Sequence, residues 1–108
     1  MKRPERETTP EMLKWLNDNG IIAWRQNSGS VRVGTRTINM GGKGQPDIMG
    51  ILPGGRFLCI ENKSNGSKVN PEQIHWMEVA RKQGAYVFVA FDLEDVVDYI
   101  ELLPKVNK

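Results

Sequence analysis

Two short apolar runs joined by Pro-Gly-Gly constrain the fold of this chain more than any other feature of the sequence. Residues 47–52 and 56–63 each have the length and composition of a strand, and residues 53–55 between them favour a tight turn. Two adjacent strands joined by so short a turn must run antiparallel. The segment 47–63 therefore predicts a pair of antiparallel strands.

The segments before this pair predict a helix, a strand and a glycine-rich connection. A threonine of the pair Thr8-Thr9 has the character of an N-cap, Pro10 suits a first turn, and Asn19-Gly20 is a stop signal, which together predict a helix that starts within residues 8–11 and continues to residues 19–20. Residues 21–25 form an apolar, β-rich run and predict a strand. We interpret residues 27–45, which include five glycines, as a flexible, basic loop or ribbon whose alternating pieces could pair as a hairpin.

The segments after the pair predict two helices with a buried strand between them. Residues 70–83 have the pattern of a helix that stops at Gly84, and residues 85–91 are an almost unbroken apolar run. A last helix is expected to begin near Asp92 and to end before Pro104. The element order is then α-β-β-β-α-β-α. It predicts an α/β fold with a mixed β-sheet flanked by helices, in a single domain over residues 1–108.

Composition excludes several classes of protein. With 39% hydrophobic and 26% charged residues, the 108-residue chain has the composition of an ordinary globular domain. No long apolar run follows the charged N-terminal residues, so the sequence predicts neither a signal peptide nor a membrane span, and we expect a cytoplasmic protein. The only cysteine, Cys59, lies in an apolar run, where we expect a buried and inert thiol.

The charge is unevenly distributed along the chain. Residues 25–68 carry seven basic side chains against two acidic ones, whereas residues 69–108 carry four basic against seven acidic ones. A basic central segment favours binding to a phosphate backbone, and the alternative is a solvated surface with chance clustering. The DNA-binding candidates are Arg25, Arg32, Arg36 and Lys43.

Two acidic residues and a lysine on the antiparallel pair are the candidate catalytic residues. The turn brings Asp47, at the start of one strand, and Glu61, near the end of the next, to the same end of the sheet. Because strand side chains alternate, Lys63 shares a face with Glu61. Paired carboxylates suit Mg²⁺ or Mn²⁺, and a metal-activated water beside a lysine suits phosphodiester hydrolysis. The alternative is a surface salt bridge between Glu61 and Lys63, with Asp47 capping a turn.

The motifs around these residues resemble the PD-(D/E)xK nuclease superfamily and, within it, the VRR-NUC (virus-type replication-repair nuclease) domains. The resemblance covers nearly the whole chain. The matching segments are residues 23–29 (AWRQNSG), 44–50 (GQPDIMG), 55–63 (GRFLCIENK), 71–73 (PEQ) and 84–85 (GA).

The resemblance implies a metal-dependent nuclease that leaves a 5′-phosphate. Asp47, Glu61 and the backbone carbonyl of Asn62 would bind the metal, Lys63 would act as base or electrophile, and Gln73 would support the site from its helix. Gln73 also lies three residues after Asn70 and could instead complete a capping box.

The sequence departs from the family pattern in two places. Asn62 stands where these domains usually have an apolar residue, so a polar amide would face a packing surface unless the strand frays there. The family often adds a glutamate from the first helix. Glu7 is the best-spaced candidate for this further metal ligand, although Pro10 places it ahead of the predicted helix.

The resemblance also implies a substrate class and a site of action. Stand-alone VRR-NUC domains of phage and bacterial type are similar to homodimeric Holliday-junction resolvases, whereas related domains fused into larger repair nucleases act on flaps and branched ends. We therefore expect a structure-selective DNA endonuclease in a bacterial cell or a phage-infected host. Symmetric cutting of a four-way junction by so small a chain requires a C₂ dimer. A flap nuclease, a non-catalytic nucleic-acid-binding module and a plain interaction domain are the alternatives.

Overall fold

The computed structural model describes residues 2–26, 30–39 and 44–105, and within them the chain contains both helices and strands. The elements in chain order are α1 (Glu5–Asp18), β1 (Ile22–Arg25), β2 (Ser30–Val33), β3 (Arg36–Asn39), β4 (Ile48–Ile51), β5 (Phe57–Asn62), α2 (Pro71–Lys82), β6 (Tyr86–Ala90) and α3 (Leu93–Leu102). The predicted α/β class is confirmed.

Four of the strands form one mixed sheet in the order β1-β4-β5-β6. β4 pairs antiparallel with β5, as the Pro-Gly-Gly turn predicts, and β1 pairs antiparallel with β4. β6 pairs parallel with β5, because α2 carries the chain back across the sheet between them. The order of the elements that build this sheet is the predicted one.

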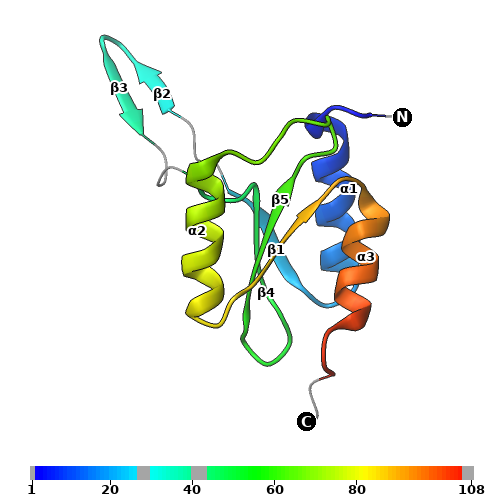
Figure 1. Ribbon diagram of the computed structural model, residues 1–108. Helices are drawn as coiled ribbons and strands as arrows, with labels where there is room; N and C mark the ends of the chain where they lie inside the picture. The colour runs from blue at the N-terminus through cyan, green and yellow to red at the C-terminus, as the bar shows by residue number, and fades with distance from the viewer. Residues whose placement is uncertain (1, 27–29, 40–43, 106–108) are drawn as a thin grey trace.

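The glycine-rich connection contributes a separate two-stranded ribbon. β2 and β3 pair antiparallel, with Val33 opposite Arg36 at the turn. In Figure 1 this hairpin extends away from the body of the molecule, at the end where β5 finishes and α1 begins. The predicted hairpin is therefore confirmed over residues 30–39.

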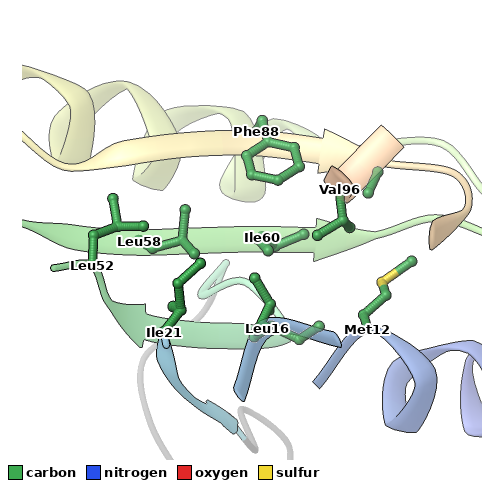
Figure 2. Packing of buried hydrophobic residues seen from close by; sticks show 10 residues of the cluster. Met12, Leu16, Ile21, Leu52, Leu58, Ile60, Phe88 and Val96 are labelled. Atoms are coloured by element: carbon green, nitrogen blue, oxygen red, sulfur yellow. The ribbon is translucent and has the colours of Figure 1, made fainter. Parts of the chain in front are cut away.

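The helices cover both faces of the four-stranded sheet. α1 and α3 lie together on one face, and α2 lies on the other (Figure 1). On the first face Met12 and Leu16 of α1 and Val96 of α3 pack against Leu58, Ile60 and their neighbours (Figure 2). On the second face Met77 of α2 packs against a smaller cluster that includes Cys59.

Cys59 is fully buried, as expected, and burial raises the pKa of its thiol to about 12. A thiol with so high a pKa stays protonated at neutral pH and is inert as a nucleophile or ligand.

The first helix begins earlier than the sequence predicts. α1 starts at Glu5 with Pro4 as its N-cap, so Thr8 is not the cap and Pro10 lies inside the helix. A proline there removes one backbone hydrogen bond but does not prevent an additional turn on its N-terminal side. That turn is stable because Thr8 and Thr9 are buried against the sheet, as described below.

The other two helices begin where their capping residues predict. The Asn70 side chain caps α2, and the Asp92 side chain accepts a hydrogen bond of 2.9 Å from the backbone N–H of Asp95 at the start of α3. In the part of the chain that is described, no helix combines the length and apolar character needed to cross a membrane.

Candidate active site

Asp47 and Glu61 lie at the same end of the sheet, on adjacent strands. Ile48 pairs with Ile60 in the β4–β5 register, so Asp47 comes directly before this pair on one strand and Glu61 directly after it on the other. The backbone N–H of Asn62 donates a hydrogen bond of 2.8 Å to Asp47 Oδ2. The two carboxylates that the sequence predicted to converge are therefore neighbours.

Glu61 is an unusual carboxyl group because it is almost completely enclosed. Its exposed fraction is 1%, and its Oε2 atom has no hydrogen-bond partner among the described residues. Burial, together with the neighbouring Asp47 carboxyl group, raises the pKa of Glu61 to about 9, although the charge of Lys63 opposes this rise. Without a cation between them, two such groups cannot readily ionise together.

Lys63 completes this group of side chains. Its Nζ atom is 3.7 Å from Glu61 Oε2, and its backbone N–H donates a hydrogen bond of 2.8 Å to Ala90 O, which extends the pairing of β5 with β6. The two side chains of this ion pair are only 10% and 1% exposed. The alternative of a surface salt bridge is therefore wrong, since the pair is buried.

The donor set fits a small divalent cation. An unpartnered, buried carboxylate oxygen normally costs about 1–3 kcal/mol, and a bound ion would remove that cost. The described residues contain no cluster of three or more His, Cys, Asp or Glu side chains that could hold a metal. Mg²⁺ does not require such a cluster, because it usually keeps several waters and binds through one or two carboxylates.

The Asn62 side chain is buried on the face of β5 that α1 covers, and β5 does not fray there. Its Nδ2 atom donates hydrogen bonds of 2.9 Å to the Oγ1 atoms of Thr8 and Thr9, and its Oδ1 atom accepts one of 3.0 Å from the Ser64 backbone N–H. The expected polar amide on a packing surface is therefore present, and α1 supplies polar partners for it.

Glu5 is an acidic residue at the start of α1 that the sequence analysis did not consider. It lies in the first turn of α1, three and four residues before the buried Thr8 and Thr9, and therefore on the sheet-facing side of the helix. Burial and the Asp47 carboxylate raise the pKa of Glu5, whereas Lys63 and Arg25 lower it. These effects indicate that its carboxylate lies within electrostatic reach of the site.

Metal binding by Glu7 stays a prediction. Glu7 lies inside α1, not ahead of it as predicted, and its half-exposed carboxylate forms an ion pair of 3.8 Å with Arg3. With the start of the helix known, spacing from the buried threonines would have made Glu5 a candidate as well.

Gln73 completes the capping box of α2. Its Oε1 accepts a hydrogen bond of 3.0 Å from the Asn70 backbone N–H, and its own backbone N–H donates one of 2.9 Å to Asn70 Oδ1. The capping alternative is thus confirmed. Support of the active site by the remaining amide group of Gln73 stays a prediction.

The basic candidates occupy β1 and the hairpin. Arg25 ends β1, and the next residue, Gln26, donates a backbone hydrogen bond of 2.7 Å to Asp47 O. Arg36 is exposed at the start of β3. Arg32 lies on β2 with a side chain that the structure does not describe, and Lys43 lies outside the described residues.

The described structure is thus a mixed sheet with helices on both faces and an Asp…Glu-x-Lys group at one end, which is the arrangement that the resemblance to nuclease domains implied. The model of the VRR-NUC domain family matches residues 3–91, so the chain belongs to this family of nucleases. A solved structure described as a VRR_NUC domain is similar to the chain, with 26% sequence identity and a TM-score of 0.66. The match covers 91% of this chain and 95% of that one. The comparison with curated proteins gives no match.

Proposed function

We propose that this protein is a metal-dependent DNA endonuclease that hydrolyses phosphodiester bonds with Asp47, Glu61 and Lys63. The observation that carries the proposal is the Glu61 carboxyl group, which is 1% exposed, has an unpartnered oxygen, and lies 3.7 Å from the Lys63 ammonium group. A fold needs no such group for its stability. A buried carboxyl with a strongly raised pKa, next to a second acid and a cation, is typical of a catalytic site.

The residues that would hold Mg²⁺ or Mn²⁺ are Asp47, Glu61 and the backbone carbonyl of Asn62. When bound, the metal would supply a water of lowered pKa and would offset charge on the phosphate. The Asn62 N–H fixes one carboxylate of the pair by its bond to Asp47 Oδ2. Glu7 stays a candidate for a further ligand from α1, and Glu5, in the first turn of the same helix, is a second one.

Lys63 has the position of a catalytic residue in this proposal. Its ammonium group would orient or deprotonate the attacking water, or stabilise the negative charge that develops on the phosphate. Because its side chain is only 10% exposed, its charge is screened much less than that of a surface lysine. The capping hydrogen bonds of Gln73 use its amide oxygen and its backbone N–H. Gln73 would therefore act on the site from α2 through its amide nitrogen.

Branched DNA is the substrate class that we propose, with a four-way junction as its main member. Arg25 and Arg36, with Arg32 and Lys43 from the same segment, would contact the phosphate backbone. Support comes from the β2–β3 hairpin, which extends from the end of the molecule where β5 finishes (Figure 1). Paired cuts in a four-way junction require two active sites, and we therefore propose a C₂ homodimer.

Single-turnover cleavage of a panel of duplex, flap, splayed and four-way DNAs with Mg²⁺ or Mn²⁺ tests the proposed function. We expect the wild-type protein to cut the four-way junction and Asp47→Ala to lose at least about 10²-fold in rate. Asp98→Ala is the matched control, because Asp98 is an exposed acid on α3, away from the site. Preferred cutting of flaps would favour the alternative substrate, and binding without cleavage would favour a non-catalytic module.

A further inference from the structure

Gly44 lies three residues before Asp47, against the first turn of α2. Its φ angle is +82°, a backbone conformation that residues other than glycine rarely adopt. A Cβ atom at this position would lie 2.7 Å from the backbone carbon of Glu72 and 3.1 Å from the backbone nitrogen of Gln73, and closer still to the Glu72 carbonyl oxygen. Only glycine therefore fits where the two backbones meet.

The first turn of α2 cannot easily give way to a side chain at position 44. The atoms that a Cβ atom would meet belong to the backbone, which cannot swing aside as the end of a long side chain can. The capping box of Asn70 and Gln73 also fixes this turn, through hydrogen bonds of 2.9 and 3.0 Å. A larger residue at position 44 would therefore displace its own segment of the chain.

The chain between Gly44 and Asp47 is short and is held at further points. Pro46 is fully buried, and its ring fixes one backbone angle. Gln26 fastens both sides of this proline, since its side-chain amide donates a hydrogen bond of 3.3 Å to Gln45 Oε1 and its backbone N–H donates one of 2.7 Å to Asp47 O. Gly44 therefore cannot move away from α2 without disturbing the bonds that place Asp47.

We propose that Gly44 is a positioning residue, which sets the distance between the first turn of α2 and the segment that leads into β4, and thereby places the Asp47 carboxylate beside Glu61. This inference rests on the proposed nuclease function. Gly44 itself would touch neither a metal ion nor the phosphate. Its role is to allow a contact between two backbones that a side chain would prevent.

The hydrogen bond of 2.8 Å from the Asn62 backbone N–H to Asp47 Oδ2 gives a readout that needs neither metal nor DNA. The NMR signal of an amide proton that donates to a carboxylate changes when the acceptor moves. We expect the Asn62 amide signal of Gly44→Ala to shift toward its position in Asp47→Ala, where the acceptor is missing. An Asn62 signal that stays at its wild-type position in Gly44→Ala would overturn the proposal.

The matched control is Gly20→Ala. Gly20 has nearly the same φ angle, +81°, but a Cβ atom there would meet no atom within 4 Å. It lies before the start of β1, whereas Asp47 bonds to Gln26 just after the end of that strand. The control therefore carries the same backbone strain without the contact. A shift of the Asn62 signal as large as that of Gly44→Ala would contradict a role for the contact with α2.

Single-turnover cleavage of a four-way junction measures what the displacement does to the reaction. A misplacement of about 1 Å can cost about 10²-fold in rate. We expect Gly44→Ala to lose about 10²-fold in cleavage rate and to keep its DNA affinity, and Gly20→Ala to keep both. A wild-type rate for folded Gly44→Ala would overturn the positioning role, whereas a wild-type rate for Asp47→Ala would reject the proposed function.

A second variant covers the case in which Gly44→Ala does not fold. A glycine inserted between Gly44 and Gln45 adds no side chain against α2 but lengthens the path from that contact to Asp47. We expect the same shift of the Asn62 signal and the same loss of cleavage rate. A wild-type Asn62 signal in the folded insertion variant would overturn the proposal.

Discussion

The backbone N–H of Asn62 donates a hydrogen bond of 2.8 Å to Oδ2 of Asp47, so β5 both carries Glu61 and orients the acid opposite it. This bond uses a backbone group and therefore does not depend on which side chain stands at position 62. The side chain of Asn62 is free to serve the other face of the strand, where it binds Thr8 and Thr9. One residue thus links both faces of the sheet at the end that holds the site.

The raised pKa of Glu61 predicts a pH-dependent stability in the absence of metal. In the folded protein this pKa is about 9, against an ordinary value of 4.5. Between these values the unfolded chain is ionised while the folded chain keeps its proton, so unfolding releases a proton and the free energy of unfolding falls as the pH rises. Below about pH 4.5 both states are protonated and this contribution to the slope disappears.

Glu61→Gln removes this titration and should flatten the decline of the free energy of unfolding with rising pH. Denaturant unfolding in a chelating buffer, from about pH 5 to pH 9, compares the two proteins over the window in which the carboxyl group titrates. We expect the variant to gain stability relative to the wild type as the pH rises. Parallel curves for the two proteins would show that Glu61 does not titrate in this way.

The basic hairpin should contribute to DNA affinity without contributing to the fold. Its two strands form a sheet of their own, so replacing Arg32 and Arg36 on them by alanine should leave the core intact, and Lys43, which follows them in the sequence, is replaced in the same variant. Each lost phosphate contact reduces the slope of log K against log salt by about 0.9. Gel-shift titrations at several salt concentrations measure both quantities, with unfolding curves as the control for structure. An unchanged affinity and slope would show that the hairpin does not touch phosphate.

The dimer that we propose should depend on the uncovered part of the α2 face. Ile22, Ile51 and Phe57 are direct neighbours on β1, β4 and β5, and all three are exposed. Trp24 lies on the same face, 6.3 Å from the Phe57 ring, on a strand at the edge of the sheet. These four exposed apolar side chains on one face form a patch, and burial of such a patch favours association.

Trp24→Glu should therefore convert a dimer into a monomer. Sedimentation at micromolar protein concentration gives the mass, and Val79→Glu, which changes an exposed apolar residue on α2, is the matched control. A wild-type protein with the mass of one chain would contradict the dimer, and a dimeric Trp24→Glu variant would exclude this face as its interface.

Most of the fold could be predicted because its signals are local. The turn at residues 53–55 determines the antiparallel pair, and Asn70 and Asp92 mark the starts of α2 and α3 through bonds to residues three positions away. The convergence of Asp47 with Glu61 follows directly from that pair. These features need no information from distant parts of the chain.

The start of α1 could not be predicted, because distant residues decide it. Pro10 suggested a first turn, but the hydrogen bonds that stabilise an earlier turn come from Asn62, 54 and 53 residues away from Thr8 and Thr9 in the sequence. Because the helix start was misplaced, Glu5 was not considered beside Glu7. The hydrogen bonds from Asn62 to Thr8 and Thr9 thus account both for the polar residue at position 62 and for the early start of α1.

Lys63→Ala distinguishes a nuclease from a module that only binds DNA. If Lys63 acts on the attacking water or on the charge of the transferred phosphate, its removal slows the reaction and leaves DNA affinity nearly unchanged, because a group used in the transition state does not contribute to ground-state binding. The loss of one positioned electrostatic contact typically costs about 10²-fold or more in rate.

The burial of the Glu61–Lys63 pair makes the stability of the Lys63→Ala protein part of the same experiment. Removal of one partner of a buried ion pair usually destabilises a protein, but burial favours the neutral form of Glu61 in the absence of metal, so no unpaired charge is left behind and the variant should still fold. Lys68→Ala is the matched control, because Lys68 is an exposed lysine in the loop after β5. The measurement is single-turnover cleavage of a four-way junction in Mg²⁺ or Mn²⁺ by folded Lys63→Ala. A wild-type rate in that assay would end the catalytic assignment of Lys63.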